Sequence, residues 1–203
     1  MKKLVSLLII CASVVGATVS AFAYSDTDNS SYKSSIDELS QLGIINGFED
    51  GTFKPQENVT RAQAATMFAA ALGYSDTKYK NIATDNAVFS DFTMSHWAYK
   101  YADYIMRSAD IVSGEINCIL NGFEDGTFRP DNNVTIIQLL KMAICSLGED
   151  GYMAEAVENG GYPNGYNTVA EKYGFSKSIA VDDINQPATR EQTAQIISNT
   201  INI

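Results

Sequence analysis

A fifteen-residue segment occurs twice in this chain, and the two copies are 75 residues apart. Residues 46–60 read NGFEDGTFKPQENVT and residues 121–135 read NGFEDGTFRPDNNVT, with twelve identical positions. Each copy combines an Asp-Gly turn, a proline and a Val-Thr pair that leads into an apolar helical pattern. A repeat of this period indicates copies of one small unit that bury their apolar faces against one another.

Apolar side chains at helical spacing flank both copies of the segment. Between Ile36 and Leu42 they recur at three-residue steps and end at Gly43, which predicts a helix with a glycine at its C-terminal end. A second apolar stripe begins after Thr60 and closes at Gly73. One unit is therefore expected to be a helix, a structured loop and a second helix.

The second and third units depart from the first. In the second, the expected first helix has one apolar face, made of Trp97, Tyr101, Ile105 and Ala109. An insertion at 114–120 lengthens its loop, and its second helix begins at Thr135. The third unit lacks the Asp-Gly-Thr-Phe loop, but a short helix ending near Tyr173 and a last helix after Thr189 are expected. The predicted organisation is mainly α, with repeat 1 at 24–74, a polar linker at 75–88, repeat 2 at 89–149 and a divergent repeat 3 at 150–203.

The first 23 residues have the pattern of an export signal. Lys2 and Lys3 precede an apolar run, and Ala21-Phe22-Ala23 forms a small-x-small cleavage site. The run is too short and badly flanked for a membrane span. We therefore expect a secreted protein with no membrane span after cleavage.

The chain is acidic, with 14 Lys and Arg against 24 Asp and Glu. Loss of Lys2 and Lys3 would change its formal charge from −10 to −12. This balance excludes nucleic acid as the expected partner, because such binding depends on basic side chains that neutralise phosphates. Beyond the signal only Cys118 and Cys145 remain. A disulfide and two buried thiols are both compatible with their positions.

Each predicted second helix begins with Thr-x-x-Gln. The pairs are Thr60 with Gln63, Thr135 with Gln138, and Thr189 with Gln192. This spacing predicts a capping box, in which the threonine and glutamine side chains satisfy free backbone amides at the helix start.

Arginine follows the threonine in two of the three units, at Arg61 and Arg190. The positive end of the helix dipole disfavours a cation at the first helical position. An arginine beside free amides can, however, form a compact site for a carboxylate. Pairing with a surface acid is the simpler alternative, but the recurrence favours an anion site. Ile136 takes this place in unit two, so we expect the site to be lost there.

No catalytic or metal site is predicted. His96 is the single histidine, so neither a Ser-His-Asp triad nor a His/Cys metal cluster can be assembled. The acidic turns at Asp50-Gly51 and Asp125-Gly126 do not have the ligand spacing of a calcium-binding loop. Paired carboxylates of the glycosidase type remain a minor alternative, since the recurring acids all lie in the turn motif. We expect a non-enzymatic protein without a cofactor.

These motifs resemble those of the S-layer homology (SLH) family. Unit two has Phe-Ser-Asp, His-Trp-Ala, NGFEDGTFRP and Val-Thr in the family's order, and unit one has GIINGFEDGTFKP followed by Val-Thr-Arg-Ala-Gln. The Gly-Gly-Tyr-Pro-x-Gly-Tyr segment with Thr-Arg-Glu-Gln resembles a divergent third repeat. The resemblance covers residues 24–203.

The resemblance implies a pseudo-threefold single-chain trimer around a central helical bundle. In the family, grooves between repeats bind secondary cell-wall polysaccharide, often through a pyruvylated amino sugar. The matching positions imply a glycan site that includes Arg61, Arg190, Trp97, Asp91, Gly47 and Gly122. Tyr162 and Tyr166 begin unit three in a way similar to Trp97, and because aromatic faces suit sugar rings we expect Tyr166 at the site as well. Because each unit lacks part of the pattern, one or two competent grooves are expected.

The expected function is therefore non-covalent anchoring at the cell wall or S-layer, with a wall polysaccharide linked to peptidoglycan as the partner. The alternative is a structural envelope or S-layer component that assembles with itself or with another exported protein. Trp97 itself fits either a core or interface anchor or a platform for a sugar ring.

Overall fold

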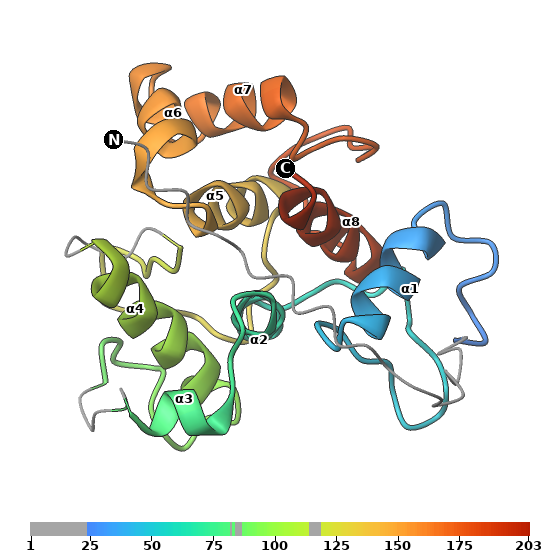
Figure 1. The fold of residues 1–203 in the computed structure, drawn as a ribbon, viewed down its shortest axis with the longest axis horizontal. Helices are drawn as coiled ribbons and strands as arrows, with labels where there is room; N and C mark the ends of the chain where they lie inside the picture. The colour runs from blue at the N-terminus through green and yellow to red at the C-terminus, as the bar shows by residue number, and fades with distance from the viewer. Residues whose placement is uncertain (1–23, 82, 84–86, 114–118) are drawn as a thin grey trace, which may run out of the picture.

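The computed structural model describes residues 24–81, 83, 87–113 and 119–203 (Figure 1). The expected export signal at 1–23 lies outside the described residues, and so does Cys118. Within the described residues the chain forms helices and no β-strand, so the predicted mainly α class is confirmed. The α-helices are α1 Lys33–Gln41, α2 Arg61–Ala71, α3 Asp76–Lys80, α4 Tyr99–Ser113, α5 Ile136–Ser146, α6 Ala154–Glu158, α7 Asn164–Tyr173 and α8 Arg190–Ile201, and a π-helical turn covers Glu149–Met153.

The long helices lie where the apolar periodicity predicts them, and the short ones do not follow from it. α3 falls inside the stretch expected to be a plain polar linker, where the Ser75 hydroxyl accepts a hydrogen bond from the Lys78 amide and so caps the helix. α6 precedes the expected start of the third unit's first helix. Trp97 lies in a turn two residues before α4, so its predicted place on the helical face is wrong.

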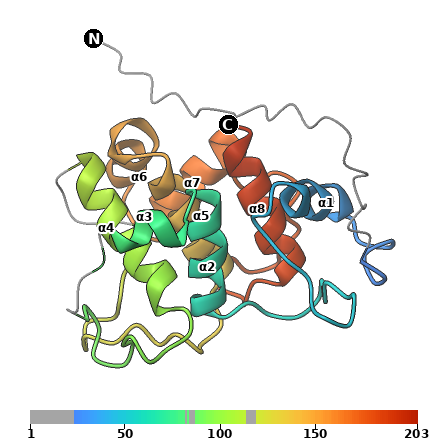
Figure 2. The same ribbon diagram turned by 60° about the horizontal axis from the view of Figure 1, so that its bottom comes forward.

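The first helix of each unit packs against the second helix of another unit. α1 packs on α8, α4 on α2, and α7 on α5. Figures 1 and 2 show the resulting three lobes, with α2, α5 and α8 on the inner side of each pair. α8 also contacts both α2 and α5. Each unit therefore buries apolar residues against another unit, and in the third unit α6 also packs on α7.

The chain segments before α2, α5 and α8 are joined by a closed cycle of backbone hydrogen bonds. The Val59 amide donates to the Ala188 carbonyl, Ala188 donates to Val134, and Val134 donates to Val59, each with an N···O distance of 2.9 Å. All three residues are buried. This cycle brings the starts of the three second helices together at one place in the molecule.

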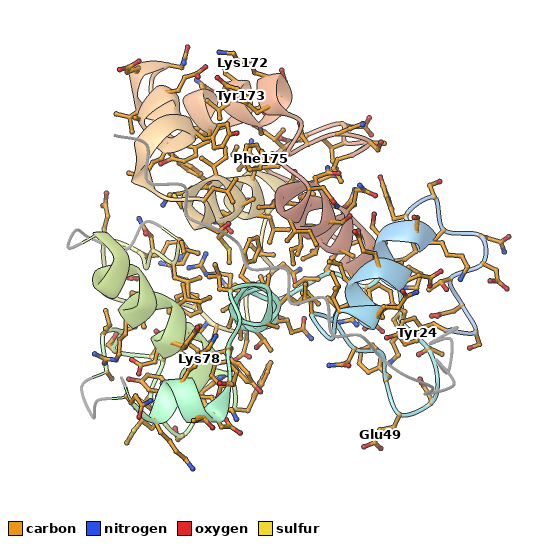
Figure 3. The ribbon with its side chains drawn as sticks, in the orientation of Figure 1. Tyr24, Glu49, Lys78, Lys172, Tyr173 and Phe175 are labelled. Atoms are coloured by element: carbon orange, nitrogen blue, oxygen red, sulfur yellow. The ribbon has the colours of Figure 1, made fainter. Side chains whose placement is uncertain are left out.

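Large apolar side chains fill the interior of each lobe. Phe53, Phe68, Phe128 and Phe175 are at most 2% exposed. Figure 3 shows Phe175 on the inner side of α7, whereas Lys172 at the end of that helix points outward. Cys145 on α5 is buried near the Tyr166 hydroxyl, at 4.0 Å.

Candidate functional site

All three predicted capping boxes are present. In α2 the Gln63 amide donates to the Thr60 hydroxyl at 3.2 Å, and the Thr60 amide donates to Gln63 Oε1 at 2.9 Å. α5 and α8 begin with the same reciprocal pair of bonds. The residue after each capping threonine is thereby fixed at the junction between units.

Arg61 reaches from the start of α2 to the repeated loop of unit two. Its Nε donates to the Phe128 carbonyl and its Nη2 to the Asn121 carbonyl, both at 2.7 Å. The guanidinium carbon also lies 5.0 Å from the ring centre of Phe123 and 4.5 Å from that of Phe128. Arg61 thus joins two units through backbone carbonyls and aromatic faces.

Arg190 makes the same contacts with the loop of unit one. Its Nε donates to the Phe53 carbonyl at 2.7 Å and its Nη2 to the Asn46 carbonyl at 3.0 Å. Phe53 and Asn46 are the counterparts, 75 positions earlier, of the two acceptors that bind Arg61. Only 5% of Arg190 is exposed, so it is a buried link between units three and one. Ile136 occupies the corresponding place in unit two and is buried.

Arg61 also lines a cavity of about 770 Å³. Cationic and aromatic side chains from three parts of the chain surround this space, including Arg61, Phe123, Arg129, Lys141 and Tyr162. Burial lowers the pKa of Arg61 to about 10, which leaves the side chain charged at neutral pH. The cavity therefore contains a positive charge that is partly removed from water.

One acid of the cavity wall, Asp125, pairs with a different arginine. Asp125 Oδ2 lies 2.9 Å from Arg129 Nη2. Hydrogen bonds from Thr127 and then Arg129 lower the pKa of Asp125 to about 2, so this carboxylate stays ionised. Arg61 forms no ion pair with a carboxylate of the described residues, because its bonds go to carbonyl oxygens. Arg61 therefore has no direct carboxylate partner among the described residues, although Asp91 attracts its charge through space.

The glycines and the aspartate expected at the glycan site hold the loop in shape. A Cβ on Gly122 would overlap with the Phe89 ring and lie 2.7 Å from the Thr127 carbonyl oxygen, and one on Gly47 would overlap with the Tyr24 ring. Asp91 accepts backbone hydrogen bonds from Phe128 at 2.7 Å and from Arg129 at 2.8 Å. The space beside both glycines is thus filled by the protein itself, although Gly122 also lines the cavity.

Asp26 binds backbone amides of the unit-one loop in the same way as Asp91 binds those of the unit-two loop. Its carboxylate accepts hydrogen bonds from the Phe53 and Lys54 amides, both at 2.8 Å. Sequence reasoning missed Asp26. The Ser-Asp pair that it shares with Ser90-Asp91, placed before the first helix of each unit, could have revealed it.

The aromatic residues are distributed differently from the expectation. Tyr166 is buried within α7, at 5% exposure, and does not line the cavity. Trp97 is 58% exposed, which excludes a core position, but it is not among the residues around the cavity. Tyr162 does line it. Tyr162 lies two residues before α7, as Trp97 lies two residues before α4.

The described residues contain neither a metal-ligand cluster nor a membrane-spanning helix. Their His, Cys, Asp and Glu side chains form no group of three or more that could hold a metal ion. Their helices include none with the length and apolar character needed to cross a membrane.

Comparison with known proteins relates the chain to one family of domains. The sequence model of the S-layer homology domain matches residues 23–65 and 117–135, which include both copies of the repeated segment in full. The whole chain aligns at 24% identity with 18% of the Middle cell wall protein of Brevibacillus brevis. A Surface layer protein of Brevibacillus choshinensis is 26% identical over 92% of the chain and 16% of its own length. The Cellulosome-anchoring protein of Acetivibrio thermocellus is 36% identical over 45% of the chain and 18% of its own length.

The chain is similar to the S-layer homology domain in the two matched segments and to these relatives, which supports its assignment to that family. It spans less than a fifth of the length of each of these three relatives.

Proposed function

We propose that this chain anchors non-covalently to the bacterial cell envelope by binding an acidic cell-wall polysaccharide in the cavity beside Arg61. The family, and relatives named for cell-wall, surface-layer and anchoring proteins, support a secreted location at the cell wall or S-layer. They also support a non-enzymatic role.

The observation that carries the proposal is that Arg61, in a cavity large enough for a sugar, has no direct carboxylate partner among the described residues. The space of about 770 Å³ lies within the size range of small-molecule sites, where a few polar groups fix the orientation of a ligand. A carboxylate is the group that best complements a partly desolvated guanidinium. An acidic substituent on a sugar, such as a pyruvyl group, would therefore interact with Arg61 while the ring fills the rest of the cavity.

We further propose that the three units act as a pseudo-threefold single-chain trimer with unequal grooves. The cyclic bonds between Val59, Val134 and Ala188 support this arrangement. Arg190 is nearly enclosed by the loop of unit one and Ile136 carries no charge, so the cavity at Arg61 is the best candidate for a competent groove.

The test is co-sedimentation of the chain with peptidoglycan sacculi. Binding should occur with sacculi that carry their polysaccharide and be lost after acid removes that polymer. Arg61→Ala should weaken binding by about tenfold or more, since charged hydrogen bonds are worth about 1.5–3 kcal/mol. Lys172→Ala is the matched control, because it removes one positive charge that is not at the cavity. Unchanged binding to stripped sacculi would contradict the proposal.

A further inference from the structure

Tyr162 differs from the other tyrosines of the third unit in what surrounds it. It precedes α7, and 49% of it is exposed, whereas the nearby Tyr166 is buried. The centres of the two rings are 6.4 Å apart. Tyr166 therefore supports one side of Tyr162 from within the lobe, and much of the Tyr162 ring stays accessible.

The accessible part of Tyr162 belongs to the wall of the cavity that contains Arg61. The two side chains are close enough to interact electrostatically. Burial raises the pKa of the Tyr162 hydroxyl, and the charge of Arg61 lowers it by a smaller amount. The cavity thus has an aromatic surface beside the Arg61 guanidinium, which has no direct carboxylate partner among the described residues.

The walls of this cavity come from all three units. Arg61 belongs to the first, Phe123 and Lys141 to the second, and Tyr162 to the third. Two guanidinium carbons already lie over the Phe123 ring. That of Arg129 is 3.8 Å from the ring centre, and that of Arg61 is 5.0 Å from it. Tyr162 is consequently the aromatic ring of the cavity without a cation over it in the described structure.

We propose that Tyr162 is a specificity-determining residue of this cavity and that its ring packs against the apolar face of a sugar whose acidic group lies at Arg61. This inference rests on the proposed function. An exposed aromatic side chain offers a large, rigid contact surface together with a polar hydroxyl, which suits a sugar ring with one apolar face and a hydroxylated edge. The tyrosine would select a cyclic acidic ligand over a simple carboxylate, which Arg61 alone could hold.

The experiment measures the affinity of the whole chain for the purified cell-wall polysaccharide by calorimetry, together with the melting temperature of each unliganded variant. Tyr162→Ala should bind about tenfold more weakly, as expected for truncation of an aromatic contact residue. Tyr162→Phe should stay within about twofold of the wild type, because the ring is kept. Trp97→Ala is the matched control: it removes an exposed aromatic residue at the same offset from its helix, outside the cavity, and should bind like the wild type.

Tyr166→Ala separates a structural role from contact with the ligand. Truncation of this buried residue should lower the melting temperature clearly, whereas Tyr162→Ala should lower it much less. An equal fall in melting temperature for the two variants would overturn the inference, and so would wild-type affinity of Tyr162→Ala or an equal loss in Trp97→Ala. If the wild type does not bind the polysaccharide, the proposed function itself fails. If the wild type binds, Arg61→Ala weakens binding and Tyr162→Ala does not, only the role of Tyr162 fails.

Discussion

At the scale of single residues, the contacts of Arg61 and Arg190 explain why a cation is found at a helix start, where the helix dipole opposes it. The first helical position costs a cation about 0.3–1 kcal/mol near an exposed helix start. Arg61 and Arg190 each gain two hydrogen bonds to carbonyls and contacts with two phenylalanine rings in return. Both residues therefore join neighbouring units, and Arg61 has the additional contact with the cavity.

Arg190→Ala should lower the free energy of unfolding by about 2–4 kcal/mol. The substitution removes two charge-assisted hydrogen bonds and leaves the carbonyls of Asn46 and Phe53 without their side-chain donor. Urea unfolding followed by circular dichroism measures the change, with Lys172→Ala as an exposed control that should lose less than about 0.5 kcal/mol. A loss for Arg190→Ala no larger than that of the control would show that the link between units contributes little.

Gly122→Ala should destabilise the chain by about 1–3 kcal/mol, because the added methyl group overlaps with Phe89 and the Thr127 carbonyl. Gly47→Ala should behave similarly, through Tyr24 and the Thr52 carbonyl. Thermal unfolding measures both changes. If these glycines served mainly to admit a sugar, Gly122→Ala would instead keep wild-type stability and lose polysaccharide binding.

The sequence predicted Arg61 as a site residue because its motif recurs, but it could not predict which of the expected residues share one cavity. Tyr166 and Trp97 were chosen by residue type and motif. Their exposure depends on how the lobes pack, and this is decided by contacts between units far apart in the chain. The roles of Asp91 and Gly122 were missed for the same reason, since their partners are backbone groups and rings of other segments.

At the scale of secondary structure, capping and apolar periodicity accurately locate the long helices. α2, α5 and α8 start directly after the threonines of the three capping boxes. α3 has five residues, none of them buried, so it has no apolar periodicity from which it could be predicted. The pairing of helices could not be predicted either, because no local sequence pattern shows that α1 packs on α8 and not on α2.

This exchanged pairing predicts that the first unit does not fold alone. A fragment of residues 24–74 contains α1 without α8, so Ile36 and Leu39, which are fully buried in the whole chain, would lose that covering helix. We expect the fragment to show little helical circular dichroism and no cooperative thermal transition, while the whole chain melts as one unit. A cooperative transition in the fragment would contradict the importance of pairing between units.

At the scale of the whole molecule, an acidic chain presents a locally cationic cavity. The formal net charge is −10, and an acidic polymer would be repelled at long range. Exposed charges are screened beyond about 10 Å at 0.1 M salt, whereas a partly buried pair is screened much less. Contacts at Arg61 can therefore determine binding despite the overall charge, and raising the salt concentration from a low value should reduce the long-range repulsion.

The most direct test of the account compares calorimetric titrations of the wild type and Arg61→Ala with the purified wall polysaccharide before and after its carboxylates are removed. The wild type should lose about tenfold or more in affinity when the carboxylates are removed, because the charge of Arg61 then has no partner. Arg61→Ala should bind both polymers equally weakly. Equal affinity of the wild type for the two polymers would contradict the central claim that Arg61 recognises the acidic group.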